Sequence, residues 1–121
     1  MYICPMYSSE LLKGTLKTII LHLLKENGKM YGYEMTQRVK SLSDDKIVIT
    51  EGALYPMLHA LEALGDVTTE TEFIGKRIRK YYKLTQQGKK TSNKKLDELK
   101  AFMSTLEVIL QTEKKAHGFA Q

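Results

Sequence analysis

The chain has 121 residues, enough for one domain with a buried hydrophobic core. Hydrophobic residues make up 42% of it and charged residues 27%, as in ordinary globular proteins, and no apolar run reaches the roughly 18 residues that span a membrane. The start lacks the basic and apolar regions of a signal peptide, so we expect a cytoplasmic protein without a membrane partner. The single cysteine, Cys4, can form no internal disulfide.

The net charge of +5 is concentrated in one segment. From Ile74 to Lys95 nine residues are basic and none is acidic, whereas the rest of the chain carries ten basic and fourteen acidic residues. A mildly acidic body with one strongly cationic segment is typical of proteins that bind the phosphate backbone of a nucleic acid. A run of charges can also be no more than a solvated face.

A first helix is predicted to begin at Ser8 or Ser9, whose hydroxyls can cap it, and to end at Asn27 and Gly28. Its apolar residues recur at helical spacing and form a stripe wider than one neighbouring helix needs. We therefore expect this helix to contact its own core and also a second surface. The stripe consists of Leu12, Leu16, Ile19, Ile20, Leu23 and Leu24.

A second, short helix is predicted from Tyr31 to Ser43. Gly32 lets another backbone come close, and the free N–H groups of this helix start could hold a phosphate, so Tyr31 and Gly32 are candidate DNA contacts. Residues 41–46 are predicted to form a polar turn and residues 47–49 a brief extended segment. The expected buried line of the helix is Tyr31, Met35, Val39 and Leu42.

The central helix is predicted between Thr50, whose hydroxyl can cap its first turn, and Gly65, which ends it. Aliphatic residues on one side form a core face, and the opposite side carries small, aromatic and hydrogen-bonding groups that could enter a DNA groove. The core face consists of Leu54, Met57, Leu58, Leu61 and Leu64, and the opposite face of Gly52, Tyr55, His59 and Ala63.

Pro56 leaves two possibilities for the central helix. Inside a helix it removes one backbone hydrogen bond and presses on the carbonyl of Gly52, which predicts a kink. Alternatively, the helix begins near Tyr55 with Pro56 in its first turn, where proline is well tolerated. We favour the kink.

A β-hairpin is predicted next. Residues 67–73 alternate in a strand pattern and are rich in β-branched side chains, and residues 78–84 likewise suit a strand. Such a hairpin must lean on the helices, because a lone pair of strands is marginally stable. The cations at or beside its tip are Lys76, Arg77, Arg79 and Lys80.

Thr85 is predicted to cap a last helix, in which apolar residues are spaced 3, 4, 3 and 4 apart, as in the seam of a coiled coil. The seam could pack on the broad face of the first helix in a second subunit, which predicts a homodimer. The alternative is that the seam folds back on its own domain. The predicted dimer interface is Leu12, Leu16, Ile20, Leu96, Leu99, Phe102, Met103, Leu106, Ile109 and Leu110.

These elements predict a mainly α-helical fold with a small β-hairpin. Residues 8–85 would form a winged helix-turn-helix domain and residues 86–113 a long C-terminal dimerisation helix, with residues 1–7 and 114–121 flexible. In this arrangement one helix enters the major groove and the hairpin lies along the backbone or in the minor groove. The predicted contacts to double-stranded DNA are Tyr31, Gly32, Thr50, Gly52, Tyr55, His59, Lys76, Arg77, Arg79 and Lys80.

Three motifs occur in order: Tyr-Gly-Tyr-Glu at residues 31–34, Glu-Gly-Ala-Leu-Tyr-Pro-Met-Leu at 51–58, and Arg-Lys-Tyr-Tyr-Lys-Leu-Thr at 79–85, followed by Gly88. Together they resemble the PadR family of bacterial transcriptional regulators. The resemblance implies a homodimeric repressor that binds an inverted-repeat operator and often responds to a small molecule. It also implies DNA contacts at Thr50, Gly52 and Tyr55 and along residues 76–80. The single last helix resembles the shorter subfamily, in which it contacts the partner's first helix.

The resemblance implies an effector site only in part. Multidrug-binding members of the subfamily stack flat aromatic ligands on tryptophans, and this chain has none. Phe102 and Met103 on the last helix are the candidates for lining a smaller pocket instead.

Other function classes have less support. A winged helix could bind another protein through the Tyr55 and His59 face, with the basic hairpin serving only solubility. The histidines are scattered and no catalytic constellation assembles, so we expect neither an enzyme nor a cofactor. Cys4, His22 and His117 lack metal-ligand spacing, so we expect no metal site.

Overall fold

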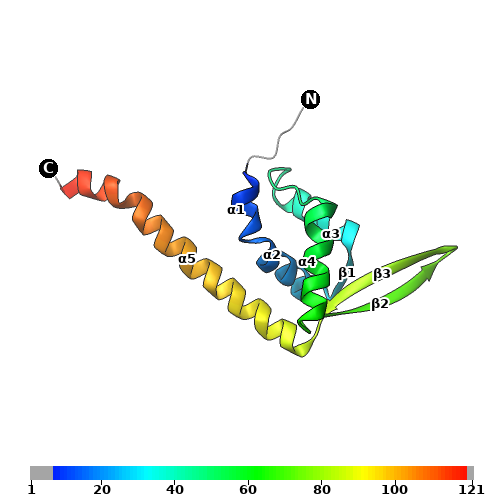
Figure 1. The fold of residues 1–121 in the computed structure, drawn as a ribbon. Coiled ribbons are helices and arrows are strands. Elements are labelled where there is room, and N and C mark those ends of the chain that lie inside the picture. The colour runs from blue at the N-terminus through cyan, green and yellow to red at the C-terminus, as the bar shows by residue number, and fades with distance from the viewer. Residues whose placement is uncertain (1–6, 120–121) are drawn as a thin grey trace, which may run out of the picture.

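The computed structural model describes the backbone of residues 7–119 and the side chains of residues 7–111. The hairpin formed by β2 (Val67–Ile74) and β3 (Arg77–Leu84), called the wing below, projects from one side of a helical body, and α5 (Gln86–Phe119) projects from the other (Figure 1). The predicted winged fold is confirmed. None of the described helices is long and apolar enough to cross a membrane. The elements are α1 (Ser9–Lys13), α2 (Leu16–Asn27), β1 (Lys29–Tyr31), α3 (Gly32–Leu42), α4 (Glu51–Ala63), β2 (Val67–Ile74), β3 (Arg77–Leu84) and α5 (Gln86–Phe119).

The predicted first helix is two helices, a correction with a local cause. Gly14, which has low helix propensity, follows α1. The Thr15 hydroxyl then donates a hydrogen bond to the Leu12 carbonyl at 3.1 Å, which competes with continuation of the helix. The chain restarts as α2 at Leu16, so α1 is a separate short arm.

The sheet has a third strand that the sequence did not predict. β1 pairs with β3 in an antiparallel arrangement, so the strand order is β1-β3-β2. Met30 lies opposite Tyr82, and both side chains are buried. Three residues are too few to show an alternating pattern, and this strand exists because β3 offers it an edge. It ties the base of the wing to the start of α3.

The core lies between α2, α3, α4 and the inner face of the sheet. Leu42 and Leu64, both predicted to be buried, are 72% and 58% exposed because each lies at the end of its helix. α4 begins at Glu51 and runs through Pro56, so the alternative start near Tyr55 is wrong. The fully buried side chains include Ile20, Leu21, Leu24, Met30, Met35, Leu54, Leu58 and Leu61.

Asp66 joins the end of α4 and the start of the wing to the start of α5. The side chain is buried and accepts hydrogen bonds from Thr91 at 2.9 Å and Gln87 at 3.0 Å. Its main-chain carbonyl accepts the Thr85 N–H at 3.0 Å. Thr85 caps α5 as predicted, because its hydroxyl accepts the Gly88 N–H at 3.0 Å. A Cβ on Gly88 would collide with the Asp66 carbonyl oxygen, so only glycine fits there.

The long helix α5 packs along α2 only over its first part. Leu96 and Leu99 are half-buried there, but the seam beyond them is exposed and does not fold back on its own domain. Its backbone is helical to Phe119, past the predicted end at residue 113. Residues 1–6 and 120–121, in the predicted flexible ends, lie outside the described residues. The exposed seam residues are Phe102, Met103, Leu106, Ile109 and Leu110.

The predicted partner surface on the first helix needs a correction. Ile20 is fully buried in the core of its own domain, and Leu16 is only 9% exposed, so neither offers much surface to a second chain. The stripe was wide because α2 is surrounded: it contacts α5 on one side and the sheet on another. Leu12, on α1, is half-buried.

Candidate nucleic-acid interface

A turn held by side-chain hydrogen bonds connects α3 to α4. Ser43 ends α3, and its hydroxyl accepts the Ile47 N–H at 2.9 Å. Asp44 and Asp45 have positive φ angles of 56° and 66°, a conformation that aspartate tolerates better than most residues. The turn leads through buried Ile49 into α4. Helices α3 and α4, which contact each other, thus form the helix pair of a helix-turn-helix.

The start of α4 is exposed. Thr50 caps it as predicted, since its hydroxyl accepts the Ala53 N–H at 3.3 Å. Glu51 and Gly52 in the first turn and His59 in the third are exposed. Gly52 and His59 are both open to solvent among the described residues, as a DNA contact requires, but Gly52 also lines the apolar groove between α4 and the first two helices.

Tyr55 differs from its prediction. It is half-buried and packs against the core, and burial raises the pKa of its hydroxyl. A Cβ on Gly32 would collide with this hydroxyl, so the missing side chain of Gly32 makes the slot that Tyr55 occupies. Gly32 is buried as a result, which corrects the prediction that it stands at an open, phosphate-binding helix start. The two predicted contacts instead form the packing between α3 and α4.

The wing carries four cations that form no salt bridge with another described side chain. A turn at Gly75, whose φ angle is +64°, connects β2 to β3. The cluster lies at or beside the tip, as the sequence predicts, with one cation in the turn and three on β3. These wing cations are Lys76, Arg77, Arg79 and Lys80.

The acidic residues of the wing are neutralised. Lys29 of β1 lies 3.1 Å from Glu70 and 2.5 Å from Glu72, and Lys83 lies 3.6 Å from Glu70. The hydrogen bond from Lys29 lowers the pKa of Glu70, while Glu72 and then Glu70 raise the pKa of Lys29. These exposed pairs contribute little to stability. Their effect is electrostatic: they remove the negative charges that would oppose an approaching phosphate.

An aromatic stack positions one wing cation. Arg79 lies over the Tyr31 ring, with its guanidinium carbon 4.1 Å from the ring centre. Tyr31 in turn meets Tyr81 edge-on, with 5.6 Å between ring centres. A hydrogen bond with Tyr81 raises the pKa of Arg79. Tyr31 thus connects the wing to the start of α3 and holds the guanidinium in place.

Sequence reasoning missed Lys29 and Tyr81 in this cluster. The signal was present in part, because Tyr81 belongs to the motif at residues 79–85. Lys29 could be found only by recognising β1, whose pairing with β3 sets it opposite Lys83. No group of three or more His, Cys, Asp or Glu side chains within the described residues is placed to hold a metal ion.

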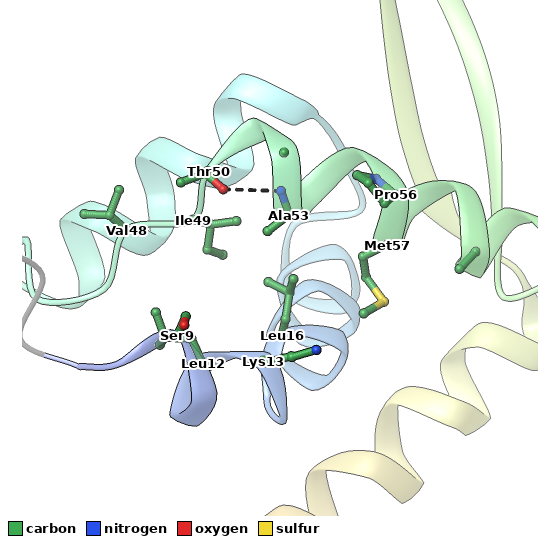
Figure 2. Close-up of a pocket in the computed structure, with 12 residues that line it drawn as sticks. Ser9, Leu12, Lys13, Leu16, Val48, Ile49, Thr50, Ala53, Pro56 and Met57 are labelled. Carbon is green, nitrogen blue, oxygen red and sulfur yellow. Dashed lines mark hydrogen bonds between the residues drawn. The ribbon is translucent and has the colours of Figure 1, made fainter.

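An apolar groove lies behind the exposed start of α4. It encloses about 510 Å³ between α1 and α2 on one side and residues 48–60 on the other. Figure 2 shows Leu12 and Leu16 facing Ala53 and Met57 across it. The part of Leu12 and Leu16 that their own domain leaves uncovered faces this groove.

A helix-turn-helix followed by a cationic β-hairpin defines the winged helix-turn-helix class of protein. Residues 20–94 match the PadR-like family of transcriptional regulators. The chain is 32% identical over 80 residues to transcriptional regulator Rv3488 of Mycobacterium tuberculosis, a match that covers 66% of this chain and 71% of that protein. The chain belongs to the PadR-like family of transcriptional regulators, as its three motifs indicated.

Two solved structures support this assignment. A transcriptional regulator from Clostridium thermocellum is similar with a TM-score of 0.75 and 31% identity, covering 84% of this chain and 95% of that one. The PadR protein of Bacillus subtilis, solved in complex with operator DNA, has a TM-score of 0.62 and 30% identity, covering 68% of this chain and 45% of that one.

Proposed function

We propose that this protein is a sequence-specific DNA-binding regulator, a homodimeric repressor that acts in the cytoplasm on an inverted-repeat operator. One observation carries the DNA-binding part: four cations that form no salt bridge with a described side chain lie on a wing whose own carboxylates are neutralised, beside a helix-turn-helix with an exposed start. The operator complex of the Bacillus subtilis relative supports the same role. The wing cations would hold phosphates, and the exposed face of α4, with Gly52 and His59, would read the major groove.

Two uncovered apolar surfaces support the dimer. One is the groove between α2 and α4, and the other is the seam of α5 beyond Leu99. A soluble chain rarely leaves such surfaces open, and a two-fold axis lets two chains cover each other's surfaces at once. The seam of one chain would pack on α1 and the groove of the other. The half-buried Leu12 then becomes an interface residue, whereas Ile20 does not.

The dimer explains why the operator would be an inverted repeat. Two winged domains related by a two-fold axis read half-sites about 34 Å or a multiple of this apart. A small-molecule effector would act by changing this spacing. Phe102 and Met103 lie on the exposed part of α5, where an apolar molecule could bind between the two chains.

The test is a gel shift with the DNA directly upstream of the protein's own gene, at two salt concentrations and with a random duplex as competitor. We expect a specific shift that weakens steeply with salt, by about ten-thousandfold between 50 and 200 mM if eight cations of a dimer meet phosphates. A random duplex should compete poorly at the higher salt. Affinity that stays flat with salt would contradict the proposed grip of the wing. The absence of any specific shift would favour the protein-interaction alternative.

A further inference from the structure

The tip of the wing carries apolar side chains among its cations. Phe73 is 76% exposed, Ile74 44% and Ile78 64%. Phe73 and Ile78 are direct partners across the two strands, so their side chains lie together on one face of the hairpin. Nearer the base this face carries the buried Tyr82 and is covered by helices. The tip extends beyond all of them (Figure 1).

We propose that this apolar tip is a wedge for the minor groove of duplex DNA, in which Phe73 presses between neighbouring base pairs and Ile78 supports it. The inference rests on the proposed DNA binding and adds a second means of recognition to it. Apolar side chains of minor-groove proteins commonly enter between base pairs and kink the duplex. The groove is about 6 Å wide, so it admits the side chains rather than the whole hairpin.

The charges around the tip favour DNA as the occupant. Lys76 lies in the turn and Arg77 directly after it, and neither makes an ion pair with any side chain of residues 7–111. A second copy of the wing would bring like charges together, whereas the phosphates that border a groove attract them. The phosphates would therefore hold the tip in place while Phe73 enters the stack.

A structural role explains part of the same observation. An aromatic residue opposite a β-branched one stabilises a hairpin, and Phe73 opposite Ile78 is such a pair. That role alone makes the two residues equally important, because truncating either one removes the same contact. A wedge makes them unequal, since an aromatic ring stacks on bases and an aliphatic side chain does not.

The wedge would also give sequence preference without a hydrogen bond to any base. Pyrimidine–purine steps such as TA and CA unstack most easily, so duplexes with such a step under the tip would bind best. Operators would then show a preferred step at the position of the wing, outside the bases that α4 reads.

The test compares Phe73→Thr with the matched variant Ile78→Thr. Threonine suits a strand and both positions are exposed, so both variants should keep the circular dichroism of the native protein. The probe is a duplex that the native protein selects from a random pool, labelled at its ends to report bending by energy transfer. We expect Phe73→Thr to lose about tenfold in affinity for this duplex and most of its bend. Binding to random duplex and the salt dependence should hardly change, and Ile78→Thr should keep most of the bend.

Four results would overturn the wedge. Equal losses for the two variants, with the bend retained, would leave only the hairpin contact. Binding of the native protein to phosphatidylglycerol vesicles through Phe73, with an unbent duplex, would assign the tip to membranes. Failure of the native protein to select any duplex would overturn the proposed DNA binding as well, whereas selection of an unbent duplex would overturn the wedge alone.

Discussion

Changing the four wing cations together to glutamine should lower DNA affinity at moderate salt by at least about a hundredfold, on specific and random duplexes alike. Each wing cation that meets a phosphate releases a counterion, and the remaining cation of the wing, Lys83, is already paired with Glu70. The slope of log affinity against log salt should become shallower by up to about 7 for a dimer with two wings. Filter binding across a salt series measures both quantities.

The matched control removes the same charge from α5. Changing Lys89, Lys90, Lys94 and Lys95 to glutamine lowers the net charge equally but leaves the wing intact. This variant should lose affinity only through the weaker overall field and should keep most of the salt slope. Similar losses for the two variants would show that net charge, and not the position of the wing cations, drives binding.

Gly88→Ala should destabilise the fold, because the added side chain has no room beside the backbone of Asp66. The added Cβ meets the carbonyl oxygen of Asp66, a backbone atom that also accepts the Thr85 N–H. Relief of the clash must separate the start of α5 from the wing and break the cap on α5. We expect the free energy of unfolding to fall by about 1–3 kcal/mol, measured by urea denaturation.

Gly14→Ala provides the control. A Cβ at Gly14 meets no atom within 4 Å, and its φ of −72° suits alanine. This variant should be as stable as the native protein or slightly more so. If Gly88→Ala had the same free energy of unfolding as Gly14→Ala, the backbone around Asp66 would have to move without loss of stability, contrary to this account.

The sequence predicted the parts of this fold that long patterns specify. The helical spacing of Leu54, Leu58 and Leu61 and the alternation in the wing identified the major elements, and the basic run located the cationic tip. The break at Gly14 and the strand β1 were missed because each depends on only a few residues. A three-residue strand forms when a neighbouring edge is present, and no local pattern records that edge.

The candidate site was predicted less completely because helical spacing does not specify a neighbour. Helical spacing placed Tyr55 on the face opposite the core. Its ring instead packs against the core, because Gly32 has no side chain and leaves room for the Tyr55 hydroxyl. The same limit applies to Ile20, which a partner chain could have covered but which its own domain buries. Arg79 was identified as a cation, whereas its stacking on Tyr31 required the paired strands.

The mass of the protein–DNA complex, measured with a nuclease footprint on the selected duplex, tests most directly whether two chains read one operator. We expect two chains per duplex and two protected segments related by an inverted repeat. Ile109→Glu, which puts a charge into the exposed seam, should give monomers and lose the footprint, whereas Ser104→Glu on the other side of α5 should behave as the native protein does. One chain per duplex with a single protected segment, or full binding by Ile109→Glu, would contradict a dimeric regulator.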